Sequence, residues 1–197
     1  MMSRMLIVPV LMAGMMSTTY AATTQDVQQF VNLLSGKIIT VLKETQNNLP
    51  ARQQAFKDIF HESADVATIA RFVSGAAWRT ATPQQQQDYV QTYADYMAYT
   101  YASRINAYNE QSVQVGRITP LGKNGYLVYT QIQQANQPKP LAVTWQISDK
   151  AGLKVTDLRI ENISMSLTQK AEFMALLAQN NNSLTGLTAL LQKRIGR

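Results

Sequence analysis

Cysteine is absent from all 197 residues. The chain therefore forms no disulfide and offers no thiolate to a metal ion, so packing alone must hold the fold together. Such a chain can work in an oxidising compartment without redox chemistry.

Charged residues are also scarce, at 15% of the chain, against about 25% in a typical soluble protein. Twenty-one glutamines and eleven asparagines supply much of the polar surface instead. The formal net charge is +6, and a mildly basic surface suits anionic headgroups or acidic partners. Because the lysines and arginines are scattered, we do not expect nucleic acid as a partner.

Long apolar runs are few, and the longest comes first, at residues 5–16. It is shorter than the roughly 20 residues of a membrane span. Arg4 precedes it, and Thr19-Tyr20-Ala21 follows as a small-x-small cleavage site. These features predict a secretory signal peptide over residues 1–21, with a transmembrane anchor as the alternative. No cysteine follows the run, which excludes a lipoprotein anchor. Residues 22–197 are expected to form a single domain.

Helical spacing of apolar residues dominates the first half of the mature chain. It predicts helices over residues 25–45, from Pro50 to about residue 62, and from an Asp65 cap to Gly75. A fourth helix is predicted over residues 83–109, with Thr82 as its N-cap and Pro83 in its first turn. Tyrosines recur along this fourth helix. They suit the rim of an apolar cavity, and an ordinary core with exposed tyrosines on the other face is the alternative.

The apolar period then changes to two, which predicts four strands at residues 113–118, 125–135, 141–147 and 153–163. Short turn sequences separate them, so we expect antiparallel hairpins. Two final helices are predicted at residues 168–179 and 183–195. The order of elements implies an α+β fold with a four-stranded antiparallel sheet packed against several helices.

Residues typical of catalysis are almost missing. His61 is the one histidine and has no spaced partner, so a structural or surface role is expected rather than a metal or acid–base role. Asp157, Arg159 and Glu161 are predicted to share a salt-bridged, solvated strand face, with a glycosidase pair as the alternative. We predict no catalytic residues, no metal and no cofactor.

Two segments carry a resemblance to a known family. Within residues 65–108, Gly75, Trp78, Ala81-Thr82-Pro83, Tyr93 and Tyr101 match its pattern of a helix ending in glycine, an aromatic residue and an Ala-Thr-Pro helix start. The chain here resembles the periplasmic substrate-binding component of the Mla phospholipid transport system, also called the toluene-tolerance family.

The second segment is LKVTDLRIENISMSLTQKAEF, in which Asp157, Glu161, Ile163 and Ser164 match the family pattern. Asn162 stands where glycine is usual, and Lys170 stands near a common arginine. The sequence LTGLTALLQK also resembles the last helix of the family, so the resemblance covers nearly the whole mature chain.

The resemblance implies an NTF2-like fold enclosing an apolar pocket for acyl chains, with no enzymatic activity. It implies a periplasmic carrier that moves phospholipid between an outer-membrane lipoprotein complex and an inner-membrane complex of an MCE-domain ring and an ABC transporter. A carrier for the hopanoid-associated branch is one alternative. A small-molecule enzyme of NTF2-like shape and a structural adaptor are two others.

Apolar periodicity and the resemblance together give a predicted set of lipid-contacting residues. From the helices and the sheet, these are Ile69, Phe72, Val73, Tyr93, Met97, Tyr101, Val128, Val143, Trp145, Ile163 and Phe173. Each of them could equally belong to a filled core.

Overall fold

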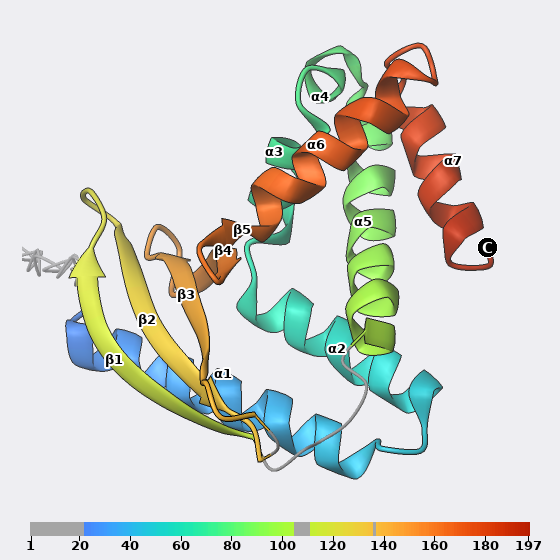
Figure 1. Cartoon of the computed structure of the whole chain (residues 1–197). Coiled ribbons are helices and arrows are strands. Elements are labelled where there is room, and N and C mark those ends of the chain that lie inside the picture. The colour runs from blue at the N-terminus through green and yellow to red at the C-terminus, as the bar shows by residue number, and fades with distance from the viewer. Residues whose placement is uncertain (1–21, 105–110, 136) are drawn as a thin grey trace, which may run out of the picture.

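Helices come first along the chain, followed by an antiparallel sheet and two further helices (Figure 1). The computed structural model describes residues 22–104, 111–135 and 137–197. The predicted signal peptide and the end of the predicted 83–109 helix lie outside these residues. The helices are α1 (Thr24–Glu44), α2 (Leu49–Ser63), α3 (Val66–Ser74), α4 (Ala77–Thr80), α5 (Pro83–Arg104), α6 (Met165–Ala178) and α7 (Leu184–Arg194). The strands are β1 (Ser112–Pro120), β2 (Gly125–Gln133), β3 (Leu141–Ser148), β4 (Lys154–Ile160) and β5 (Ile163–Ser164).

Side-chain caps set the starts of all the described helices except α4, as the sequence predicted at two positions. Asp65 Oδ1 accepts a hydrogen bond from the Thr68 amide at 3.1 Å. Thr82 Oγ1 accepts from the Gln85 amide at 3.3 Å, and Gln85 Oε1 accepts from the Thr82 amide at 2.9 Å. These bonds satisfy amides that have no partner within the helix. The predicted starts of α3 and α5 are therefore confirmed.

The sheet has one apolar face, which α1 covers. Strand order is β1-β2-β3-β4-β5, and every neighbouring pair is antiparallel. Trp145 of β3 lies opposite Val128 of β2 on one side and Leu158 of β4 on the other. Because directly paired residues point to the same face, the alternating apolar positions of adjacent strands form one continuous surface. Val27 and Val31 of α1 pack into that surface and are completely buried.

Two bulges bend the sheet. In β1 one extra residue lies between Val115 and Ile118, where the Arg117 guanidinium carbon sits 4.5 Å from the ring centre of Tyr129. In β4 the pairing shifts between Val155 and Asp157. A bulge adds one unpaired residue and increases the local twist. In β4 it also places Val155 on the apolar face and Asp157 on the opposite face.

The predicted fourth strand is interrupted, so the sheet has five strands among the described residues rather than four. Glu161 and Asn162 have φ angles of 49° and 67°, and they form a two-residue turn that brings Ile163 opposite Ile160. Two successive residues at positive φ are typical of the tight turns of β-hairpins. The chain thus reverses at the sheet edge and enters α6 directly.

Buried apolar side chains form two separate clusters. The helical cluster joins α3, α5, α6 and α7 and is centred on Val73, Tyr89, Tyr93, Phe173 and Leu187. The sheet cluster joins α1, the apolar sheet face and Ile59 of α2. Figure 1 shows the sheet and α1 in one part of the molecule, α5 to α7 in the other, and α2 between them. Within the described residues, none of the helices has the length and apolar character that crossing a membrane requires.

Positive φ at Asn162 generates a prediction about stability. Replacing Asn162 by valine should lower the free energy of unfolding by about 1–2 kcal/mol, because a β-branched residue resists left-handed backbone geometry. Replacing it by glycine, which accepts that geometry freely, is the matched control and should cost little. Urea denaturation followed by circular dichroism compares the two. Equal stability of the valine and glycine variants would contradict the account of this turn.

Candidate functional site

The helical members of the predicted lipid-contacting set lie mainly in the helical cluster. Ile69 and Val73 of α3 are buried there together with Tyr93 of α5 and Phe173 of α6, and Met97 packs against the same cluster while partly exposed. Tyr93 and Phe173 are completely inaccessible to solvent. The long helix therefore turns its tyrosine stripe toward other helices.

Tyr93 has aromatic neighbours on three helices. Its ring centre lies 6.1 Å from that of Phe173 in a perpendicular arrangement and 6.2 Å from that of Phe60 on α2. Its hydroxyl donates to Gln169 Oε1 at 2.6 Å, and Gln169 Nε2 in turn donates to the Met97 sulfur at 3.0 Å. Edge-to-face aromatic pairs contribute beyond their buried area, and the buried hydroxyl has a partner. Tyr93 therefore holds α2, α5 and α6 in a fixed relation.

Three further members of the predicted set lie in the sheet cluster. Val128, Val143 and Trp145 are buried on the apolar sheet face. The Trp145 indole donates to Thr130 Oγ1 at 3.0 Å, and that hydroxyl donates to the Val143 carbonyl at 2.9 Å. A polar group placed within an apolar surface is thus satisfied internally.

The remaining three members are accessible to solvent. Tyr101 is half-buried on α5, whereas Phe72 and Ile163 are 39% and 59% exposed. The predicted set is therefore divided between two clusters and an outer surface.

The sheet offers more apolar residues than the sequence prediction included. Partly buried members of the sheet cluster include Val115, Ile118, Tyr126, Ile132, Leu141, Leu158 and Ile160. The strict alternation of apolar residues along these strands was the signal that could have identified them. Because they are partly accessible, they offer apolar area that protein side chains have not fully covered.

The two clusters meet at a narrow seam. The Asp65 amide donates to the Val155 carbonyl at 2.9 Å, next to an isolated bridge between Ala64 and Val155. Lys154 Nζ donates to the Glu62 carbonyl beside it. The end of α2 is therefore held to β4 by these hydrogen bonds, in addition to the burial of Ile59 in the sheet cluster.

Asp157 forms the predicted ion pair with Arg159, at 4.0 Å, but it does not lie on a solvated strand face. It is 9% exposed, accepts a hydrogen bond from Ser164 Oγ at 2.6 Å, and accepts another from the Ser166 amide at 2.9 Å. Glu161 lies in the turn and accepts from the Ala142 amide. A carboxylate at the first turn of a helix interacts favourably with the free amides there. Asp157 therefore fixes the start of α6 on the sheet, and the face is not solvated at this position.

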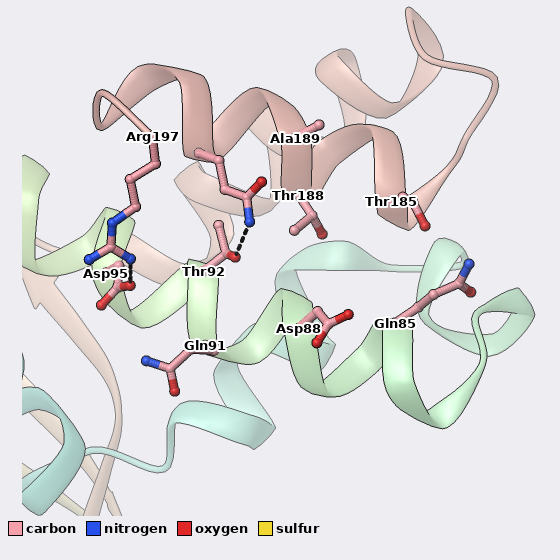
Figure 2. Close-up of a pocket in the computed structure, with 10 residues that line it drawn as sticks. Gln85, Asp88, Gln91, Thr92, Asp95, Thr185, Thr188, Ala189 and Arg197 are labelled. Carbon is pink, nitrogen blue, oxygen red and sulfur yellow. Dashed lines mark hydrogen bonds and ion pairs between the residues drawn. The ribbon is translucent and has the colours of Figure 1, made fainter.

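A polar cavity of about 390 Å³ lies between α5 and α7 (Figure 2). Asp95 is buried at one end, where it forms ion pairs with Lys57 of α2 at 2.6 Å and with Arg197. Gln192 donates to Thr92 across the cavity at 3.3 Å. Its lining is glutamine, threonine and aspartate, so this cavity is not the apolar pocket predicted from the sequence.

A metal site would require several ligating side chains close together within the residues that the structure describes. No cluster of histidine, aspartate and glutamate there could hold a metal ion. His61 is exposed, as the sequence analysis expected.

Burial raises the pKa of three tyrosines on α5. For Tyr89 the loss of solvent raises the pKa strongly. Burial also raises the pKa of Tyr93 well above its usual value, and that of Tyr101 to a smaller extent. These hydroxyls stay neutral at physiological pH and serve the packing of the helices rather than proton transfer.

Comparison with known proteins decides the family. The family model described as MlaC protein matches residues 32–193, a range that contains most of both clusters. The chain belongs to the MlaC family. The resemblance drawn from the sequence is thereby confirmed, and the α+β architecture agrees with it.

A solved structure supports the fold of this MlaC-family chain. The chain is similar to a phospholipid-binding protein from Ralstonia solanacearum, which was solved in complex with a phospholipid. The TM-score is 0.75 and the sequence identity is 21%. The similarity covers 85% of this chain and 96% of the other.

The raised tyrosine pKa values predict a loss of stability at alkaline pH. Above pH 10 the unfolded chain releases tyrosine protons that the folded chain retains, so the free energy of unfolding should fall by about 1.4 kcal/mol per pH unit for each such tyrosine. Replacing Tyr89 by phenylalanine should remove one of these contributions. Tyr99, 41% exposed on the same helix, provides the control through its own replacement by phenylalanine. Denaturation between pH 8 and 11.5 measures the slopes, and equal slopes for both variants would contradict the assignment.

Proposed function

We propose that this protein is a periplasmic carrier that binds the acyl chains of phospholipid and moves lipid between the two membranes. Its proposed partners are an outer-membrane lipoprotein complex and an inner-membrane complex with an MCE-domain ring and an ABC transporter. The match of the MlaC family model to residues 32–193 carries this proposal. The phospholipid bound to the structurally similar Ralstonia protein supports it.

Export is part of the proposal. Residues 1–21 are taken as a signal peptide that is removed, which leaves residues 22–197 as one lipid-binding domain. The absence of cysteine fits a protein that works in an oxidising compartment.

Transfer energetics explain why a carrier is needed. Each methylene moved out of water contributes about 0.8 kcal/mol. Two acyl chains of ordinary length therefore represent roughly 20 kcal/mol or more against crossing water as a free monomer. An apolar site offsets most of this difference, so that exchange with a membrane complex becomes nearly balanced. The carrier itself then requires neither catalysis nor a bound nucleotide.

The apolar sheet face is the proposed wall of the site. Its partly buried side chains, such as Ile132, Leu141 and Ile160, offer apolar area that α1 leaves partly uncovered. The opposite wall is proposed to be α5, where Met97 and Tyr101 are partly accessible. The eleven residues predicted from the sequence remain the proposed lipid-contacting set.

Binding in this region requires the two clusters to separate. Met97 packs against the helical cluster, whereas Ile132 and Leu141 pack against the sheet cluster, so an acyl chain would enter between the two walls as the helical cluster moves relative to the sheet. We propose that the seam at Ala64 and Val155 is the hinge, because Ala64 belongs to the helical cluster and Val155 to the sheet cluster. Close-packed cores rearrange as units, which favours motion at such a boundary.

Organic extraction of the purified protein followed by mass spectrometry tests the function. We expect phospholipid in amounts near one molecule per chain. Hopanoid in its place would assign the protein to the hopanoid-associated branch. Absence of any lipid from protein isolated without detergent would contradict the proposal and favour a structural adaptor.

Substitutions on the two proposed walls test the site. Met97→Glu and Val143→Glu should each reduce co-purified lipid by at least about tenfold, because burying an unpaired carboxylate among acyl chains is costly. Leu33→Glu is the matched control, since Leu33 is an apolar residue that is 67% exposed on α1, and it should retain full lipid. Circular dichroism identifies variants that are folded. A folded variant of either wall that keeps all of its lipid would refute the assignment of that wall.

A further inference from the structure

The outward face of α6 is apolar, although its inward face already packs in the core. Leu167, Ala171, Met174 and Ala178 follow one another at spacings of four, three and four, which places them in one stripe. All four are exposed, whereas Gln169, Phe173 and Leu177 on the other side of the helix are buried. A surface helix normally presents polar residues to water, so this stripe is unusual.

Neighbouring segments extend the stripe into a patch. Ile163, which directly precedes α6, is 59% exposed. Lys170 Nζ lies 4.4 Å from the ring centre of Phe72 on α3, and a Cβ built on Gly75 would lie 2.9 Å from the Met174 sulfur. We define the α6 patch as Phe72, Ile163, Leu167 and Met174. These are four of the eight large apolar side chains that are exposed among the described residues, so the patch is a concentration and not a random scatter.

Positive charge borders the α6 patch. Lys170 lies over Phe72, and Arg71 next to it is exposed. The nearby carboxylates are already engaged. Glu172 forms an ion pair with Arg194 at 2.6 Å, Glu161 forms one with Lys139 at 3.9 Å, and Asp157 is buried under the start of α6. The border of the patch is therefore cationic.

We propose that the α6 patch binds the surface of an anionic lipid bilayer. Apolar side chains inserted among headgroups, together with lysine or arginine beside anionic lipid, are the two contributions that hold a helix at a membrane surface. We expect Leu167 and Met174 to insert among the headgroups. We expect Arg71 and Lys170 to attract the anionic lipid. The inference rests on the proposed function only for its biological use, since a lipid carrier works close to a membrane.

Charge favours a bilayer over a second copy of this chain. In a two-fold symmetric dimer through this patch, Arg71 and Lys170 of each copy would approach a cationic border of the same kind. Like charges at close range are unfavourable in such an interface. An anionic headgroup layer complements both the apolar centre and the cationic border.

Sedimentation with lipid vesicles tests the proposal. The purified protein is mixed with vesicles of phosphatidylglycerol and phosphatidylcholine at equal amounts, or of phosphatidylcholine alone. We expect binding to the anionic vesicles, weakened by salt. Leu167→Glu should reduce the partition coefficient by at least about tenfold, because it replaces an inserted apolar group with a repelled charge. Leu33→Glu, an equally exposed site on α1, should have little effect.

A second pair of variants tests the charges. Arg71→Gln should weaken binding to anionic vesicles severalfold, whereas Lys43→Gln at the exposed end of α1 should not. Absence of binding by the unmodified protein would overturn the proposal, as would equal losses in Leu167→Glu and Leu33→Glu. Concentration-dependent dimerisation abolished by Leu167→Glu would also overturn it, in favour of a contact between copies.

Lipid extraction keeps this test separate from that of the proposed function. Leu167→Glu should retain full co-purified lipid while losing vesicle binding. A protein that carries lipid but never sediments with vesicles would overturn the α6 patch alone.

Discussion

The packing of Tyr93 against Phe173 is the contact on which the helical half of the molecule depends. It joins α5 to α6, and the same tyrosine reaches Phe60 on α2. A tyrosine can occupy the centre of this core because its hydroxyl donates to Gln169. An unsatisfied hydroxyl in the same place would cost several times what a typical hydrogen bond contributes. The hydrogen bond between Tyr93 and Gln169 therefore supports the packing of α5 against α6.

The buried apolar side chains form two cores rather than one, and few elements link them. Each cluster has completely buried members, yet α2 and the Asp65–Val155 hydrogen bond make the link between them. Asp157 provides a second connection, because it holds the first turn of α6 on β4. The architecture thus consists of two apolar clusters linked by these contacts, which suits a protein proposed to admit a large apolar ligand between them.

Local patterns in the sequence were sufficient to predict most of the helices and strands. The caps at Asp65 and Thr82 and the alternation from Leu141 to Ile147 predicted their structures, because each depends on neighbours within a few residues. The turn at Glu161 and Asn162 was missed, since glutamate seldom adopts positive φ and the predicted strand was extended to Ile163. The shift in pairing next to Asp157 has no sequence signal at all. Asp157 keeps the face that the sequence predicted, but the start of α6 lies over it, so the carboxylate is not in water.

The candidate site was harder to predict than the fold, for a physical reason. Periodicity identifies which face of a helix is apolar, but it does not say what that face meets. Tyr93 and Val143 both lie on apolar faces, yet they belong to different clusters. The polar cavity between α5 and α7 depends on Asp95 meeting Lys57 and Arg197, which are far apart along the chain. Contacts of this kind follow from the assembled structure alone.

The bulge in β1 has a consequence for behaviour at high concentration. Strand β1 has one partner in the sheet, so its other edge presents free backbone groups that another chain could extend. The bulge between Val115 and Ile118 breaks the regular spacing of those groups, Arg117 adds charge there, and Pro120 removes a donor at the end. A neighbouring molecule therefore finds no straight template along which to add a strand. Resistance to fibril-like stacking is thus built into the rim of the sheet.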